Sequence, residues 1–235
     1  MAAKPTVKQV LAELKRFENP ESVKGMASVG INPENSYGVC MPRMMAIAKR
    51  IGTNHPLALE LWKSGIRDAR ILASMVEDPE LVTPRQMDSW ARDLNSWDVC
   101  DSACMRVFCE TKFARKKIAQ WARDRREFVK RAGFSTLAFL TCHDKKADDK
   151  AFEKFFPLIT RASTDDRNYV RKAVNWALRT IGKRSIRLNR SALKVARQLA
   201  RSKSKPARWI GSDAVRELAG PAVQKRLLKQ APKKD

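Results

Sequence analysis

Two aspartates and a tryptophan stand close together in the segment Asn95–Cys104 and could do chemistry together. Asp98 and Asp101 are three residues apart, so in a helix they share one face near its N-terminus, and Trp97 stands at the entrance of that helix. A carboxylate in such a place can act as a general base or stabilise a developing positive charge. Acids in the first turn of a helix also serve as caps and interact favourably with the helix dipole, and a tryptophan commonly lies in the hydrophobic core. Spacing alone leaves both interpretations open.

The cysteines and histidines do not form a second chemical site by their spacing. The chain has five cysteines, an odd number in apolar helical contexts, which suits a reducing cytoplasm better than a disulfide framework: Cys40, Cys100, Cys104, Cys109 and Cys142. No pair forms a CxxC, and His55 and His143 are far apart, so we expect no structural zinc. The three cysteines that flank the aspartates are expected to be packing thiols. His143 is expected at a helix end.

Positive charge is concentrated in the last third of the chain. The chain carries 48 Lys and Arg against 25 Asp and Glu, a net charge of +23. Residues 167–235 hold 20 of these cations and only three acids, a net of +17, and residues 1–166 hold the remaining +6. Spaced apolar residues within this stretch indicate a folded polycation, which attracts polyanions, chiefly nucleic acid. A generally basic solvated surface, or a ribosome or membrane-surface binder, is the alternative.

The size and hydropathy of the chain suit one folded domain over residues 1–235. Apolar residues make up 43% of the 235 residues, enough for a core. No apolar run approaches the roughly 18 residues of a membrane span. The first 18 residues lack an apolar block with a cleavage site, so we expect no secretory signal and a cytoplasmic protein. Nothing signals an oligomer, so a monomer is the default.

The apolar pattern is helical from end to end, with Pro, Gly, Asn and Asp in short breaks. Thr83-Pro84 is a start signal, and Ser96 stands before the acid of a first turn. Gly52 and Gly182 are stop signals. The spacing predicts helices over 6–18, 20–29, 41–52, 56–64, 66–77, 83–94, 97–111, 114–124, 126–143, 149–163, 168–183, 189–202, 206–219 and 221–230. The ends of the chain are least defined, namely 1–36 and a basic tail, 225–235, that could fray.

Several helices share an internal motif, a basic residue followed by tightly spaced small and apolar residues. The motif begins at Arg70, Arg131, Arg171 and Arg208, and the last three lie about 40 residues apart. That period is typical of paired-helix solenoids of the HEAT or armadillo type, in which small residues let neighbouring helices approach closely. We therefore expect an all-α solenoid of about six to seven stacked helix pairs. The second helix of each pair would line a concave basic cleft. Alternatively, the arginines are ordinary solvated charges.

Three short motifs, taken in order, resemble the AlkD group of DNA alkylation repair proteins, the HEAT-like-repeat DNA glycosylases. They are Ser96-Trp-Asp-Val-Cys-Asp101, Phe128-Val-Lys-Arg-Ala132 and Lys172-Ala-Val-Asn-Trp-Ala-Leu-Arg179. The similarity runs from about Tyr37 to about Arg216. It implies an α-helical solenoid that holds duplex DNA in a concave cleft and excises positively charged N3- and N7-alkylated purines, without metal or cofactor.

The resemblance also assigns roles to individual residues. The catalytic aspartate falls on Asp101, the active-site arginine on Arg131, and the two cleft tryptophans on Trp97 and Trp176. Two departures concern the activity more than the fold: Ser96 stands where well-studied members have a first tryptophan, and residues 1–36 are not clearly matched. Asp98 receives no role and is interpreted as a dipole-stabilising first-turn acid.

The remaining candidates are cations and tryptophans. Phosphate contacts are expected from basic residues that would act through charge without reading sequence: Arg167, Arg171, Lys172, Arg179, Lys183 and Arg208. Trp62, Trp90 and Trp121 stand among apolar residues at helical spacing and are expected in the core. Trp209 could be core or cleft.

Three functions remain open from the sequence. The first is a monofunctional alkylpurine DNA glycosylase, without a lyase step because the motif at Asp101 has no evident lysine nucleophile. The second is a non-catalytic helical-repeat protein that binds duplex, branched or damaged DNA. The third is a protein-binding solenoid, and the net charge of +17 in the last 69 residues disfavours it, because a peptide groove does not need that charge. Asp101 favours the first function. A carboxylate in a phosphate-binding cleft lowers the affinity for DNA, so we expect one there only if it takes part in the chemistry.

Overall fold

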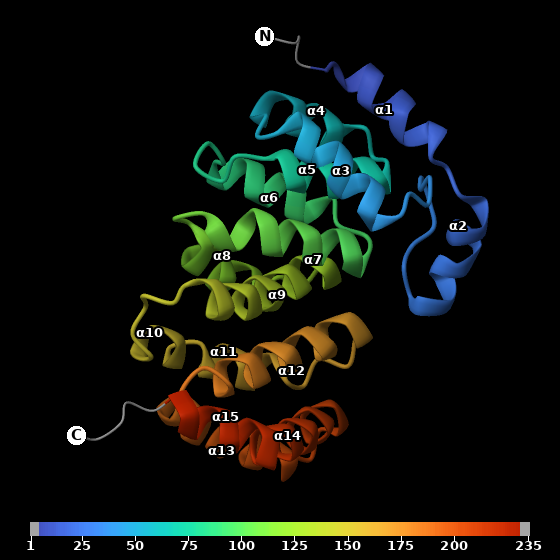
Figure 1. The fold of residues 1–235 in the computed structure, drawn as a ribbon. Helices are drawn as coiled ribbons and strands as arrows, with labels where there is room; N and C mark the ends of the chain where they lie inside the picture. The colour runs from blue at the N-terminus through green and yellow to red at the C-terminus, as the bar shows by residue number, and fades with distance from the viewer. Residues whose placement is uncertain (1–4, 231–235) are drawn as a thin grey trace. The chain divides into compact units, whose positions relative to one another are not determined.

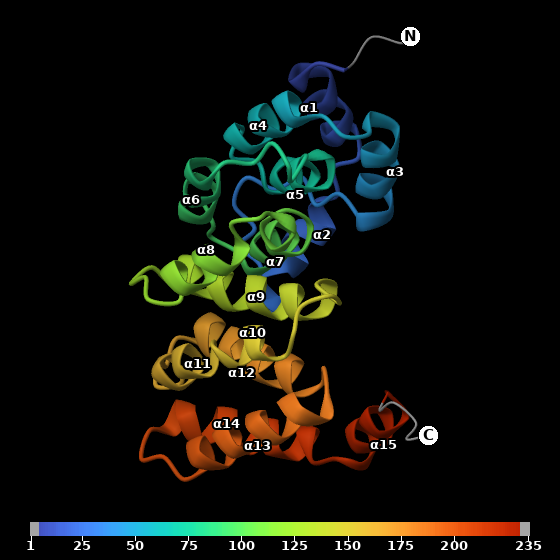
Figure 2. The same cartoon turned by 90° about the vertical axis from the view of Figure 1, so that its left-hand side faces the viewer.

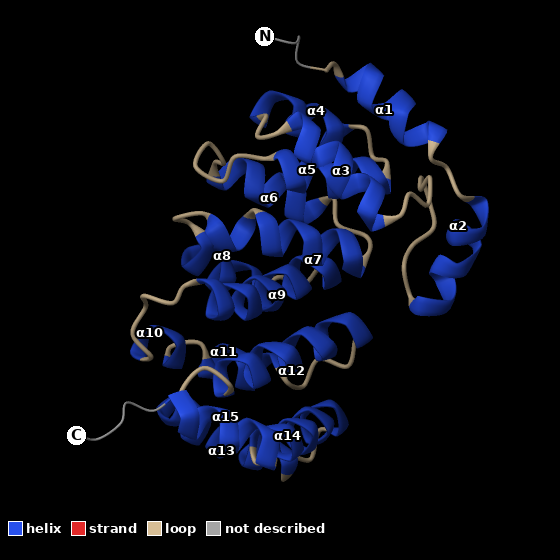
Figure 3. Cartoon of the chain, viewed as in Figure 1, coloured by secondary structure: helices blue, strands red, loops and turns tan. Residues whose placement is uncertain are grey.

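A computed structural model describes residues 5–230, and its chain is helical throughout these residues, with no strand (Figures 1 and 3). The fold class predicted from the sequence is therefore confirmed. No helix in this part of the chain combines the length and the apolar character that a membrane crossing requires. By its internal contacts the chain divides into two compact units, the first ending at Lys112 and the second beginning at Phe113.

The first unit contains seven α helices and two short 3-10 helices among its described residues. In chain order they are α1 (Val7–Arg16), α2 (Pro20–Met26), η1 (Ala27–Val29), α3 (Met41–Ile51), α4 (His55–Lys63), α5 (Arg67–Val76), α6 (Pro84–Arg92), α7 (Trp97–Arg106) and η2 (Phe108–Glu110). Helix α5 packs on α4 and on α7. At the core, the rings of Trp62 and Trp90 stack in parallel with their centroids 4.0 Å apart, and both are nearly fully buried.

The second unit continues with helices that pack in pairs. They are α8 (Ala114–Trp121), α9 (Glu127–His143), α10 (Lys150–Glu153), α11 (Phe156–Ala162), α12 (Asn168–Gly182), α13 (Ile186–Ala200), α14 (Lys205–Leu218) and α15 (Pro221–Gln230). Helix α9 packs on α8, α12 on α11 and α14 on α13. Helix α12 also contacts both α9 and α14 (Figures 1 and 2). We call α5, α7, α9, α12 and α14 the second helices.

Side-chain caps begin many of these helices. The hydroxyl of Thr6 accepts a hydrogen bond from Gln9 N, and the Gln9 side chain accepts one from Thr6 N, which is a capping box. Thr83 caps α6, as its sequence predicts, and Asn19 and Asn54 cap α2 and α4. Each of α2, α4 and α6 has proline at the first or second position after its cap, where a missing N–H costs nothing.

Glycines allow two helix pairs of the second unit to approach closely. A Cβ on Gly133 of α9 would lie 2.9 Å from the backbone nitrogen of Ala122, just after α8. A Cβ on Gly211 of α14 would lie 2.5 Å from the carbonyl oxygen of Ala196 in α13. These distances are too short for a real side chain. The small residues of the repeated motif therefore have the packing role expected from the sequence.

Several predicted helix boundaries are wrong, two of them for a local reason that the structure shows. The predicted helix 149–163 is interrupted after Glu153, and Pro157 stands in the first turn of the next helix, α11. Helix α13 begins three residues before its predicted start, because the Ser185 hydroxyl accepts a hydrogen bond from Leu188 N at 3.1 Å. The predicted helix 97–111 is α7 followed by the 3-10 helix η2.

The two predicted stop glycines behave differently. Gly52 ends α3 with φ of 70°, in the left-handed region. Gly182 is still helical, and the helix ends after it at Lys183. A Cβ on Gly182 would lie 2.6 Å from a methyl carbon of Leu218 in α14, so close packing is the constraint at this glycine.

Candidate functional site

Asp101 and Trp97 lie on one face of α7, in the first unit. They are four residues apart, about 40° around a helix with 3.6 residues per turn, and both are partly exposed. The indole Nε1 of Trp97 donates a hydrogen bond to the carbonyl oxygen of Val29 at 3.2 Å. The 3-10 helix η1 thus fixes the edge of the Trp97 ring beside the predicted catalytic acid.

Asp98 has a structural environment that differs from a simple first-turn acid. Its Oδ2 accepts hydrogen bonds from Arg67, from Nε at 2.6 Å and from Nη2 at 2.5 Å, and its Oδ1 accepts one from Ser96 Oγ at 2.5 Å. Both charged side chains are only 11–12% exposed. Asp98 therefore ties the start of α7 to the start of α5. The sequence placed Asp98 in the first turn correctly but gave no sign of the arginine 31 residues earlier.

Ser96, which precedes Trp97, links α7 to the N-terminal segment of the first unit. Its hydroxyl accepts a hydrogen bond from the backbone N–H of Asn32 at 3.2 Å and donates to Asp98. Ser96 is 2% exposed. Ser96 is packed too closely for a tryptophan side chain to fit at this position. The serine that departs from the motif is therefore matched by the neighbouring residues 29–32.

Arg131 lies in α9 of the second unit and is buried, with 6% of its surface exposed. Its Nη1 donates a hydrogen bond to the carbonyl oxygen of Tyr169, in the first turn of α12, at 3.1 Å. The side chain therefore spans two second helices. Direct contact of so buried a guanidinium with a phosphate stays a prediction.

The predicted cations and tryptophan of α12 gather on one side of that helix. At about 100° per residue they cover an arc of about 140°, opposite the apolar face that packs on the core: Arg171, Lys172, Trp176, Arg179 and Lys183. The ring of Trp176 meets that of Phe139 of α9 edge-on, with centroids 4.8 Å apart, and stays partly exposed. This arc is the basic face of the second unit.

Two of these cations have carboxylate partners on α14. Lys183 Nζ lies 2.7 Å from Glu217, and Arg179 donates to Glu217 and lies 3.6 Å from Asp213. Burial acts to raise the pKa of Glu217, but the hydrogen bond from Lys183 and the charge of Arg179 together outweigh burial and lower it. Glu217 is therefore ionised at neutral pH and holds both cations against α14.

The other predicted phosphate contacts divide between the open surface and internal bonds. Lys172 is exposed. The guanidinium of Arg171 lies over the ring of Trp209, 4.7 Å from its centroid, and Trp209 is 40% exposed, which decides against a core position. Arg208 donates to the carbonyl oxygens of Ser202 and Lys203, in the turn between α13 and α14.

An ion-pair cluster holds the loop before α12. Asp165 accepts hydrogen bonds from Arg167 and Lys130, at 2.7 and 2.8 Å from their terminal nitrogens. The hydrogen bond from Arg167 is the main reason why the pKa of Asp165 lies well below its usual range, with Lys130 adding to the effect against burial. Arg167, a predicted phosphate contact, is thus engaged within the protein.

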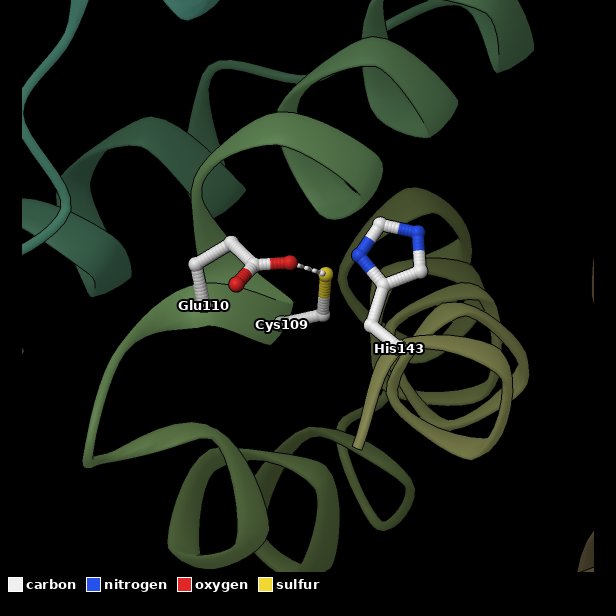
Figure 4. Close-up of side chains that lie close together, drawn as sticks. All are labelled: Cys109, Glu110 and His143. Atoms are coloured by element: carbon white, nitrogen blue, oxygen red, sulfur yellow. Dashed lines mark hydrogen bonds between the residues drawn. The ribbon is translucent and has the colours of Figure 1, made fainter. Parts of the chain in front are cut away.

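The thiols that flank the aspartates are packed inside, as expected. Cys100 and Cys104 of α7 are fully buried. The Cys109 thiol lies 3.1 Å from the carbonyl oxygen of Met105 and 3.4 Å from Glu110 Oε1 (Figure 4). His143 is the last residue of α9, which confirms its predicted place at a helix end.

Comparison with known proteins now adds to this geometry. The model of a family described as DNA alkylation repair enzyme matches residues 10–218. The chain belongs to the DNA alkylation repair enzyme family. The match includes α1 and α2, in the N-terminal region that the sequence motifs left unmatched, and it ends before α15. No curated protein sequence matches the chain.

A solved structure has the same fold as this member of the DNA alkylation repair family. It is described as "a new family of proteins related to the HEAT-like repeat DNA glycosylases with affinity for branched DNA structures". The TM-score is 0.79 and the identity 21%, and the alignment covers 95% of this chain and 96% of the other. The likeness confirms the HEAT-like repeat fold predicted from the sequence.

Proposed function

We propose that the protein is a DNA glycosylase that excises cationic N3- and N7-alkylated purines from duplex DNA. The observation that carries the proposal is the position of Asp101. The fourth or fifth residue is arginine in four of the second helices, namely Arg70, Arg131, Arg171 and Arg208, and in α7 the fifth residue is this aspartate. An acid at the position where the other second helices have arginine lowers the positive charge that favours DNA, so we interpret it as serving a chemical use.

The chemistry needs one ionised carboxylate. A purine alkylated at N3 or N7 is already cationic, so when the bond from C1′ to the ring nitrogen breaks, the electron pair neutralises the leaving base. Positive charge then develops on the deoxyribose, and a water molecule adds to C1′ and loses a proton. Asp101 would stabilise that charge and orient the water. A second, protonated carboxyl group is unnecessary, unlike in most glycoside hydrolases.

Trp97 and Trp176 would contact the sugar-phosphate backbone and exclude water from the reacting sugar. The indole of Trp97 is fixed by Val29 and that of Trp176 by Phe139, so each ring is held before DNA binds. Arg131 would favour the ionised form of the acid and the bound phosphate through its charge. The basic face of α12 would hold the duplex by neutralising phosphates.

The second candidate function is non-catalytic binding of branched or damaged DNA. It is favoured by the solved structure of the same fold, whose description names affinity for branched DNA. The same cations would serve both functions. The two candidates differ only in whether free base is released.

The test is Asp101→Asn, assayed on duplex DNA that contains 7-methylguanine. A carboxylate about 4 Å from the sugar cation in a partly exposed site contributes about 4 kcal/mol, taking an effective dielectric of about 20. Its loss should therefore slow excision about 10³-fold. DNA affinity should hold or rise, because a negative charge is removed.

Asp98→Asn is the matched control, with the same chemical change one turn away. It breaks the pair with Arg67, so we expect a lower melting temperature but little change in excision by the folded protein. Equal effects of the two variants on excision would make Asp101 a structural residue. No release of base by the wild-type protein, together with tight binding to a four-way junction, would favour the second candidate function.

A further inference from the structure

We infer that a groove beside Trp176, completed by the C-terminal helix α15, binds the phosphates of a DNA strand. The inference rests on the DNA binding in the proposed function, and it adds a contribution from α15, which follows the matched family region. The groove has a volume of about 790 Å³ and lies within the second unit. Its walls come from the end of α9 and the loop after it, from α12, and from α15.

Three cations from three different elements line this groove: Lys145, Lys183 and Arg226. Lys145 follows α9 and is exposed, Lys183 ends α12 and is partly exposed, and Arg226 lies on α15 and is exposed. Cations spread over separate elements along an open groove match the spaced charges of a phosphodiester chain. A site for one free phosphate would instead bring its donors together around a single point.

The remaining charges of the lining are engaged in holding the walls. Arg184 donates to the carbonyl oxygens of Thr141 and Ala147, both at 2.8 Å, and so fixes the loop after α9. Asp149 accepts a hydrogen bond from Ser185 at 2.5 Å and lies 3.9 Å from Arg184. With this pair of opposite charges set aside, and with Lys183 bound to Glu217, the lining keeps Lys145 and Arg226 against the single carboxylate of Asp148.

Arg226 joins α15 to α12. Its Nη2 donates a hydrogen bond to the carbonyl oxygen of Lys183 at 2.8 Å, where α12 ends. A guanidinium has five N–H groups, and this bond uses one of them. The bond holds the cation at the rim, and the fork geometry suits a phosphate. The family match ends at residue 218, so α15 supplies a wall that the family model does not cover.

Trp176 contributes an aromatic surface to the lining. Its ring is braced edge-on by Phe139 and remains partly exposed. An indole face packs well on a deoxyribose, while flanking cations neutralise the phosphates on either side. A strand that contacts Trp176 would therefore reach Lys145 and Arg226 as it continues along the groove.

The test measures binding of the full-length protein to an undamaged 30-base-pair duplex over a range of salt concentrations. Arg226→Ala and Lys145→Ala should each reduce the slope of log affinity against log salt by about 0.9, which is about a 5-fold loss of affinity at 0.15 M salt. Lys225→Ala, an exposed neighbour on α15 outside the lining, should leave the slope unchanged. Arg226→Lys should retain the slope, since it keeps the charge.

The possible results separate this inference from the proposed function. If the wild-type protein binds with a steep salt slope and both alanine variants keep that slope, the inference is wrong and the proposed function is untouched. If Lys225→Ala changes the slope as much as Arg226→Ala, the slope depends on the charge of α15 in general and not on the groove, and the inference is wrong. Inorganic phosphate or dAMP at millimolar concentration should compete with the duplex equally for the wild-type protein and for Arg226→Ala. Selective displacement would identify a small-phosphate site and overturn the inference. Release of 7-methylguanine by the wild-type protein tests the proposed function separately.

Discussion

Replacing Glu217 by glutamine should strengthen DNA binding while it weakens the fold. Glu217 on α14 holds Lys183 at 2.7 Å and also binds Arg179, and all three side chains are 27–29% exposed. The lowered pKa of Glu217 means that its charge is present at neutral pH. The variant removes that charge and leaves a neutral side chain of the same shape. Both cations then gain freedom to move toward a phosphate.

The size of the effect follows from the number of cations released. Each additional phosphate contact adds about 0.9 to the salt slope, or about 5-fold in affinity at 0.15 M salt. Arg179 keeps a second partner in Asp213 at 3.6 Å. Release of Lys183 alone therefore predicts a gain of about 5-fold, and release of both predicts about 30-fold. The lost pairs are partly exposed, so stability should fall by about 1 kcal/mol.

Fluorescence anisotropy with a labelled duplex at several salt concentrations measures the gain, and urea unfolding measures the loss. Glu21→Gln is the control, because it changes the net charge equally but sits in α2, where its exposed side chain pairs with Lys24. It should alter affinity by less than 2-fold, since Glu21 pairs with Lys24 and its replacement releases neither Arg179 nor Lys183. An unchanged or reduced affinity of Glu217→Gln would mean that Arg179 and Lys183 serve α14 and do not contact phosphate.

Two further predictions concern the stability of the second unit. The lowered pKa of Asp165 stabilises the fold above the unfolded pKa of about 3.9 and loses that effect as pH falls below it. Asp165→Asn should therefore lower the urea midpoint most at pH 7 and by distinctly less near pH 2, where part of the stabilisation is already lost, and an equal change at both values would contradict the ion-pair role. Gly211→Ala should cost about 2 kcal/mol or more, because its Cβ would overlap the backbone of α13. Gly25→Ala, with open space around it, should instead stabilise α2 by about 0.5–1 kcal/mol. Thermal melts of both glycine variants measure these changes, and a loss of stability in Gly25→Ala would refute the packing argument.

Helix positions could be predicted from the sequence because their signals are local. The cap at Thr83 and the stop at Gly52 each act within one turn of the helix they bound. The role predicted for Gly182 was wrong because a distant residue decides the outcome there. Gly182 is needed for contact with Leu218, which lies 36 residues further along the chain, and no local pattern distinguishes that use of glycine from a stop.

The candidate site was predictable only in part, for the same reason. The motifs made Asp101 and Arg131 candidates, but the partners of the neighbouring charges depend on how the second helices stack. Arg67 meets Asp98 across 31 residues, and Arg179 meets Glu217 across 38. One signal was available: Asp213 and Glu217 are the only acids between residues 167 and 234, and their spacing of four places them on one helical face.

The bond from Trp97 to Val29 bears on the order in which the chain folds. It joins positions 68 apart, whereas the pair of Arg67 and Asp98 joins positions 31 apart. Closing the longer loop costs about 0.7 kcal/mol more in chain entropy by the logarithmic law. Helices α5 and α7 can therefore pack together first, and the N-terminal segment that contains Val29 packs onto them afterwards. The indole of Trp97 reaches its final orientation only when the segment that contains Val29 has packed onto α7, so a chain that begins after Val29 would keep Asp101 and lose the aligned ring.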